Sequence, residues 1–123
     1  MIKQVLGAKI GFTGSADVTS VVTIGSKNGE LAFLFNVDER SSVALTEPEA
    51  FGLLAWAHAM VVGFMETRPF GHCKILGVEV GGVEVGAKNY GFSQVCVTQG
   101  GRVLDISMRT LSSVLEWGCG DGA

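Results

Sequence analysis

The sequence is poor in the residue types that most catalytic and metal sites require. It has two histidines and three cysteines, with no CxxC pair, so neither a zinc knuckle nor a disulfide framework is indicated. No GxGxxG or P-loop pattern leads from a strand into a helix, although the chain contains 18 glycines. We therefore expect no metal, no cofactor and no enzymatic activity.

The two histidines do not complete a catalytic group. His58 lies in an apolar helical segment, where a core or interface histidine is expected. His72 and Cys73 are adjacent on an expected strand, so their side chains point to opposite faces and cannot form a dyad.

Charge is also scarce. Charged residues make up 17% of the chain, the formal net charge is −3 and the pI is about 5.3, which disfavours a protein that grips duplex DNA through its phosphates. The longest apolar run, Ala50 to Met65, is shorter than the roughly 20 residues of a membrane-spanning helix. With no signal-peptide pattern at the amino terminus, we expect a soluble, intracellular and therefore cytoplasmic protein.

Apolar residues are abundant instead. They make up 47% of the chain and the mean hydropathy is +0.39, which is high for a chain of 12.9 kDa. Surplus apolar surface usually ends in an interface between subunits, so we expect a homo-oligomer.

The first half of the chain predicts four short strands and a helix. β-branched and aromatic residues predict strands over 5–12, 18–25, 30–37 and 41–45, and the Asn28-Gly29 pair suits a tight hairpin. Thr46 and Glu49 form a capping box that predicts a helix from Glu47 to Met65. Its apolar residues surround the helix, which predicts burial on several sides.

The second half repeats this order. Strands are expected over 74–81, 82–86, 92–98 and 102–106, followed by a helix over 107–118 with Ser107 as its cap. A turn at Gly81-Gly82 would place Glu79 and Glu84 on neighbouring strands. These carboxylates fit a solvated face, or else an acid–base or cation-binding pair.

An offset of 61 residues aligns the two halves. Gly25, Lys27, Asn28, Leu54 and Trp56 then fall on Gly86, Lys88, Asn89, Leu115 and Trp117. The sequence thus predicts an α+β fold made of a duplicated ββββα unit, with two antiparallel sheets and two helices. Residues 1–123 would form one domain, with pseudo-repeats at 1–65 and 73–118; the alternative is a chance alignment of two strand-rich halves.

A tandem ββββα chain resembles the plant Whirly family and the related kinetoplastid mitochondrial RNA-binding proteins. A single unit is similar to the positive cofactor 4 family. The resemblance implies two packed sheets, helices in the core and at the oligomer interface, and single-stranded nucleic acid running along the sheets. The Whirly motif Lys-Gly-Lys-Ala-Ala-Leu has its nearest counterpart at Lys27 to Ala32, where only Lys27 carries over and Glu30 replaces a basic residue.

Single-strand binding requires aromatic faces for stacking and a few cations along the backbone of the nucleic acid. The predicted binding residues are Lys9, Lys27, Lys74, Lys88, Tyr90, Phe92 and Arg102. Further aromatic candidates are Phe12, Phe33 and Phe35, although Phe33 and Phe35 share a strand face with Leu31 and Val37, a pattern typical of a core. The predicted partner is single-stranded DNA or RNA.

The predicted oligomer interface lies on the first helix, at Phe51, Trp56, Met60 and Phe64. An alternative function is an oligomeric structural or interaction protein with no nucleic-acid role. In that case basic and aromatic side chains would be scattered over both sheet faces. A further alternative, a small-ligand protein, would require a deep apolar pocket between the halves.

Overall fold

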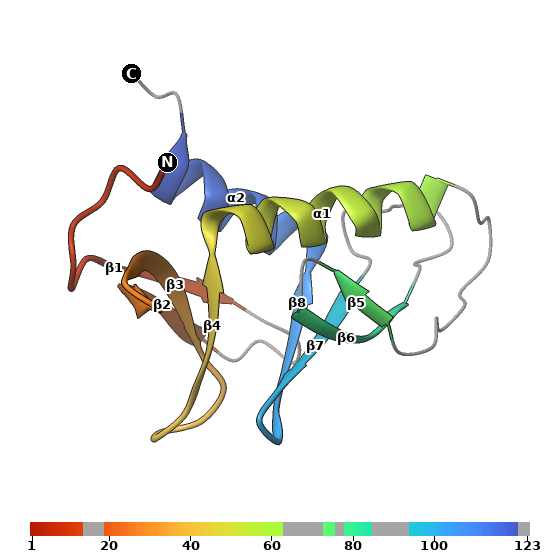
Figure 1. Cartoon of the computed structure of the whole chain (residues 1–123), viewed down its shortest axis with the longest axis horizontal. Coiled ribbons are helices and arrows are strands. Elements are labelled where there is room, and N and C mark those ends of the chain that lie inside the picture. The colour runs from red at the N-terminus through yellow and green to blue at the C-terminus, as the bar shows by residue number, and fades with distance from the viewer. Residues whose placement is uncertain (14–18, 63–72, 76–77, 85–93, 121–123) are drawn as a thin grey trace.

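The computed structural model describes residues 1–13, 19–62, 73–75, 78–84 and 94–120 (Figure 1). The elements are β1 (Lys9–Thr13), β2 (Thr19–Lys27), β3 (Glu30–Asn36), β4 (Ser42–Thr46), α1 (Glu47–Val62), β5 (Cys73–Ile75), β6 (Val78–Glu84), β7 (Gln94–Gln99), β8 (Arg102–Ser107) and α2 (Met108–Cys119). Within these residues the strands form two antiparallel sheets, ordered β1-β2-β3-β4 and β5-β6-β7-β8. The predicted α+β class with two antiparallel sheets and two helices is confirmed.

Two hairpins reverse through residues with left-handed backbone conformation. Asn28 and Gly29 have φ values of 52° and 83°, and join β2 to β3 as the sequence predicted. Gly100 and Gly101, with φ values of 57° and 81°, join β7 to β8 in the same way. Positive φ at both central residues gives a turn whose twist matches that of the flanking strands, which is why these reversals need only two residues.

The Gly81-Gly82 turn predicted from the sequence is wrong. Both glycines lie inside β6, where the pairing with β7 shifts register between Val80 and Gly82. Glycine often marks such a bulge, because it tolerates the local distortion of the strand. Glu79 and Glu84 therefore lie on one strand, opposite Thr98 and Gln94 of β7, and not on neighbouring strands.

Both helices begin where the sequence predicted, at caps formed by the last residue of a strand. The Thr46 amide donates to Glu49 Oε1 at 2.9 Å and the Glu49 amide donates to Thr46 Oγ1 at 3.4 Å, so the capping box of α1 is confirmed. Ser107 Oγ accepts the Thr110 amide at 3.0 Å at the start of α2. The described part of α1 ends at Val62, so its predicted end at Met65 lies outside the described residues.

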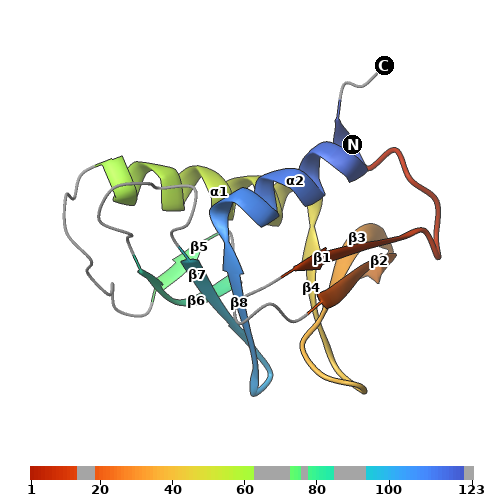
Figure 2. The same cartoon turned by 180° about the vertical axis from the view of Figure 1, so that it is seen from behind.

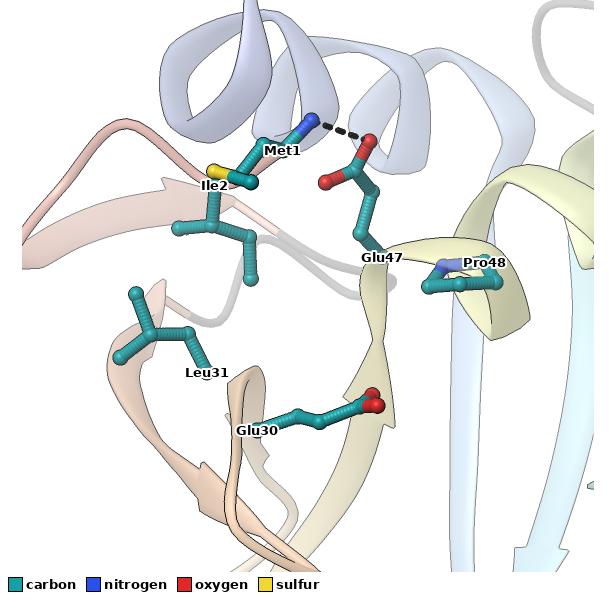
Figure 3. A pocket seen from close by; sticks show the side chains of 6 residues that line it. All are labelled: Met1, Ile2, Glu30, Leu31, Glu47 and Pro48. Carbon is teal, nitrogen blue, oxygen red and sulfur yellow. Dashed lines mark hydrogen bonds and ion pairs between the residues drawn. The ribbon is translucent and has the colours of Figure 1, made fainter.

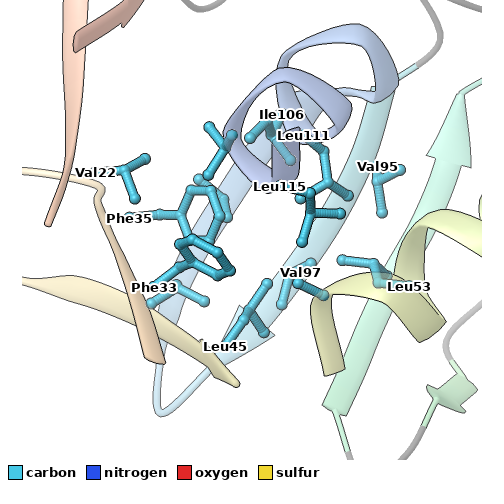
Figure 4. Close-up of a cluster of buried hydrophobic side chains, with 14 of the residues drawn as sticks. Val22, Phe33, Phe35, Leu45, Leu53, Val95, Val97, Ile106, Leu111 and Leu115 are labelled. Atoms are coloured by element: carbon cyan, nitrogen blue, oxygen red, sulfur yellow. The ribbon is translucent and has the colours of Figure 1, made fainter. Parts of the chain in front are cut away.

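One buried cluster combines apolar side chains from both sheets and both helices (Figure 4). Phe33 and Phe35 are fully buried, with ring centroids 6.2 Å apart, so the core assignment for these two aromatics is confirmed. The fully buried large side chains are Val22, Ile24, Phe33, Phe35, Val43, Leu45, Leu53, Ile106 and Leu111.

The helices lie together on one side of the sheets, and the β3–β4 and β7–β8 hairpins point away from them (Figures 1 and 2). Among the α1 side chains that the structure describes, those of residues 47–59, only Ala50, Leu53 and Ala57 are fully buried, while Phe51 and Ala55 are exposed. One side of the helix is therefore buried within the chain, and burial of its other side by a partner stays a prediction. Among the described residues, neither helix has the length and hydropathy that crossing a membrane requires.

Candidate nucleic-acid interface

The face of the first sheet that points away from the core carries one exposed cation, Lys9. Lys9 on β1 pairs with Thr23 on β2, Thr23 pairs with Leu34 on β3, and Leu34 pairs with Ala44 on β4. These four residues form one row across the outer face of the sheet. Lys9 is exposed at the edge of this row, and the other three residues are partly buried. The face therefore offers one positive charge on a mainly small and uncharged surface.

Aromatic side chains of the first sheet lie on its other face. Phe12 alternates with the residues of the outer row, packs against the core and is partly buried, whereas Phe33 and Phe35 are inaccessible. Among the described residues of β1 to β4, none of the candidate aromatics is thus placed on the outer face for stacking on a base. Any contact of this sheet with nucleic acid has to rest on cations and small polar groups.

Lys27 has a partner within the chain. Its ammonium donates to both oxygens of the Glu49 carboxylate, at 2.8 and 2.9 Å, and both side chains are largely shielded from solvent. Partial burial raises the pKa of Glu49, but the hydrogen bonds from Lys27 and the Thr46 amide outweigh it and hold the pKa below its ordinary value. Lys27 thus connects the end of β2 to the capping box of α1, and its predicted nucleic-acid role would compete with this ion pair.

The tip of the β3–β4 hairpin presents an exposed arginine on an ordered turn. Asp38 Oδ1 accepts the amides of Arg40 and Ser41 at 2.8 and 2.9 Å, and Asp38 Oδ2 accepts Ser41 Oγ at 2.6 Å. These bonds form an Asx-type turn that leaves the Arg40 side chain exposed. The carboxylate is used to hold the turn, so Arg40 projects from a defined position.

The β7–β8 tip carries a second exposed arginine, Arg102. Its Nε donates to the Gln99 carbonyl at 3.1 Å, which leaves the rest of the guanidinium available to solvent. The hydrogen bond from Ser41 and that from the Arg40 amide lower the pKa of Asp38, and the positive charge of Arg102 lowers it further. The two hairpin tips are therefore within electrostatic reach of each other.

The remaining predicted binding residues cannot be placed as side chains. Lys74 lies in β5, with Glu79 as its register partner, and its side chain is outside the described residues. Lys88, Tyr90 and Phe92 also lie outside the described residues. Their roles stay predictions from the sequence.

The thiols of Cys96 and Cys119 have raised pKa values. Burial raises the pKa of Cys96, and the adjacent Asp105 carboxylate, its register partner on β8, raises it further. Burial also raises the pKa of Cys119, with the Glu47 carboxylate acting in the same direction. Both thiols are protonated near neutral pH. Within the part of the chain that the structure describes, no cluster of histidine, cysteine and acidic side chains could hold a metal ion.

The predicted oligomer-interface residues of α1 have different environments. Phe51 is 45% exposed, whereas Trp56 is partly buried against the core. The side chains of Met60 and Phe64 lie outside the described residues. His58 is exposed, so the core position considered for it is wrong, and an interface role stays a prediction.

Two residues of this region were missed by the sequence analysis. The stretch Asp38 to Ser41 has the residue types of an Asx turn, which could have indicated that Arg40 projects. No pattern in the sequence indicates the contact of Gln99, because the Ala44 backbone that it contacts lies 55 residues away in the sequence.

Comparisons of the chain with protein-family models, curated proteins and solved structures find no match.

Proposed function

We propose that this chain binds single-stranded nucleic acid inside the cell, without catalysing a reaction, on the side of the molecule opposite the helices. The observation that carries the proposal is the pair of exposed arginines, Arg40 and Arg102, on two hairpin tips that point away from the helices. Lys9 adds a third exposed cation on the outer face of the first sheet. Their role would be to contact phosphates.

The charge balance favours a single strand over a duplex. A net charge of −3 and few cations give too little phosphate neutralisation for a strong grip on duplex DNA. Single-strand binding gains about 1 to 3 kcal/mol per stacked base, so it needs fewer ionic contacts. Tyr90 and Phe92 are the proposed stacking residues, with Lys74 and Lys88 as additional cations; these four assignments rest on the sequence.

We also propose that the fold arose by duplication of a ββββα unit. At the offset of 61 residues, buried positions of the β4–α1 segment coincide with buried positions of the β8–α2 segment. The coinciding pairs are Val43 and Leu104, Leu45 and Ile106, Ala50 and Leu111, Leu53 and Val114, and Ala57 and Gly118. Repetition of the burial pattern, beyond repetition of residue types, supports a common origin of the halves.

The test is fluorescence anisotropy of a labelled oligo-dT of about 30 nucleotides, a length chosen to span several stacking sites. The five proposed cations, Lys74 and Lys88 included, predict a slope of log affinity against log salt of about −3.5, since each contact to a single strand contributes about −0.7. Arg102→Ala is expected to make the slope about 0.7 less steep. Lys3→Ala is the matched control, because Lys3 is exposed next to the end of α2, on the helix side.

Two results would refute the proposal. One is the absence of binding below about 100 µM at low salt, the weak end of ordinary nonspecific affinity. The other is an equal loss of binding in the Lys3 and Arg102 variants, which would indicate a response to net charge and no defined site.

The second candidate function is an oligomeric interaction module with no nucleic-acid role. It is favoured by the separation of the predicted cations: Lys9 lies on a sheet face, Lys27 is paired with Glu49, and Arg102 lies on a hairpin tip. A failure of oligo-dT binding in the assay above would leave this candidate in place.

A further inference from the structure

The outward face of α1 is mainly apolar, although it lies on the surface of the chain, and His58 is the exposed polar residue among its described side chains. Phe51 is 45% exposed, and Ala55 and Ala59, one and two turns further along, are also exposed. Helix α2 differs, because its exposed positions carry polar side chains: Arg109, Ser112, Ser113 and Glu116. A surface helix with an apolar outer face indicates a surface that another molecule covers.

An open hollow lies beside the start of this helix (Figure 3). Its volume is about 490 Å³, and it is lined by Met1, Ile2, Glu30, Leu31, Glu47 and Pro48. Ile2 and Leu31 supply apolar walls from two segments far apart in the sequence, and Glu30 and Glu47 lie at opposite sides in Figure 3. The space is large enough for an aromatic side chain.

The hollow and Phe51 belong to one continuous surface. Pro48 lines the hollow, and Phe51 follows it three residues later in α1, so the two side chains lie on neighbouring positions of the same helix face. A projecting aromatic ring beside an apolar hollow has the form that a twofold-symmetric interface requires, in which the same patch must supply both complementary parts.

We propose that two copies of this chain associate about a twofold axis, each inserting Phe51 into the hollow of the other. The two α1 helices then pack across each other over Ala55 and Ala59, whose small side chains permit close approach. A partner of different sequence would need only the ring or only the hollow. Their presence side by side therefore points to a second copy.

The area that a stable dimer buries requires both the α1 face and the hollow in the contact. A 16-residue helix is about 24 Å long and about 10 Å wide, so its footprint is roughly 240 Å². A stable dimer buries about 800 Å² per partner, which the helix face alone does not supply. The hollow and its rim, where Met1 is 91% and Leu31 is 36% exposed, extend the contact beyond the helix.

The first experiment is sedimentation velocity of the full chain, without nucleic acid, over micromolar concentrations. We expect a dimer, and we expect Phe51→Ser to raise its dissociation constant about 30-fold, as for a central aromatic residue of an interface. Val103→Ser is the matched control, because Val103 is 49% exposed on β8 and lies away from α1. Neither substitution removes a buried side chain, so both variants retain the fold.

The second experiment locates the contact. A photoreactive phenylalanine analogue is placed at position 51, and equal amounts of ¹⁴N- and ¹⁵N-labelled protein are mixed, so that mass spectrometry separates links between copies from links within one. Links between copies to the segments containing Ile2 or Leu31 support the proposal. A monomer at about 100 µM, equal effects of the two serine variants, or links between copies only to other segments would overturn it.

Discussion

The side-chain amide of Gln99 pairs with both backbone groups of Ala44. Gln99 Nε2 donates to the Ala44 carbonyl at 2.9 Å, and the Ala44 amide donates to Gln99 Oε1 at 2.9 Å. Ala44 lies on β4, an edge strand of the first sheet, and Gln99 ends β7 of the second sheet. One side chain thus occupies backbone groups that an edge strand would otherwise present to another chain, and it connects the two sheets.

Replacing Gln99 is expected to weaken the junction of the sheets. Gln99→Ala leaves the amide and carbonyl of Ala44 without these partners, and we expect the free energy of unfolding to fall by about 1 to 3 kcal/mol. Gln99→Glu should cost more, because a carboxylate oxygen replaces the donor that faces the Ala44 carbonyl. Urea denaturation measures the loss, and hydrogen exchange at the Ala44 amide identifies its location.

Thr98→Ala is the control for this substitution, since Thr98 is the neighbouring β7 residue on the opposite face. It should leave the exchange rate of the Ala44 amide unchanged. If Gln99→Ala also leaves that rate unchanged, the Gln99 contact does not hold β4 in solution.

The Lys27–Glu49 pair predicts a dependence of stability on pH. The pKa of Glu49 is lowered in the folded chain, so the pair contributes fully above the ordinary pKa of 4.5 and its contribution is lost as pH falls toward the folded-state value. Lys27→Met should cost about 1 kcal/mol at pH 7. It should also make the decline in stability below pH 4.5 shallower than in the unaltered chain.

Thermal unfolding between pH 3 and 7 tests this dependence, with Lys9→Met as the control, because Lys9 is exposed on β1. The Lys9 variant should keep the pH profile of the unaltered chain. A Lys27 variant with the same profile as the Lys9 variant would contradict a stabilising role for the pair.

Replacing Gly118 by alanine would have two opposite effects on the stability of the fold. Alanine is better than glycine inside a helix by about 1 kcal/mol, but a Cβ at position 118 of α2 would lie 2.4 Å from the ring of Phe33. Overpacking a core costs about 1 to 3 kcal/mol, and the ring is fully buried, so we expect Gly118→Ala to lower the stability.

Denaturation of Gly118→Ala, Ser112→Ala and the combination with Phe33→Leu separates these contributions. Ser112 is exposed on the same helix, so alanine there should raise the stability slightly. In the Phe33→Leu background the Gly118 substitution should cost less, since the ring is gone. An equal cost in both backgrounds would show that the Phe33 contact is not the cause.

Local sequence signals predicted the framework of the fold. Thr46 with Glu49, and Ser107, mark the two helix starts, because capping is satisfied by residues within three positions in the chain. Asn28-Gly29 marks a hairpin for the same reason: the backbone conformation depends on those two residues. The shared strand face of Phe33 and Phe35 with Leu31 and Val37 likewise indicated the core, and both aromatics are fully buried.

The same type of signal was misleading at Gly81-Gly82. A glycine pair is compatible with a turn or with a bulge, and the choice depends on the strand that lies alongside. Pairing of β6 with β7 on both sides of Gly82 makes the pair a bulge, whereas the other glycine pair, Gly100-Gly101, forms the turn. The sequence alone cannot separate these cases, because the deciding hydrogen bonds are made with another strand.

The sequence by itself determined the order of strands and helices, their caps, the tight turn at Asn28-Gly29 and the apolar character of α1, because these depend on residues close together in the chain. Only the tertiary structure decided that Lys27 is paired with Glu49, that Gln99 covers Ala44, and that Phe51 lies beside a hollow lined by Leu31. Each of these relationships joins groups distant in sequence, and folding alone brings them within contact distance.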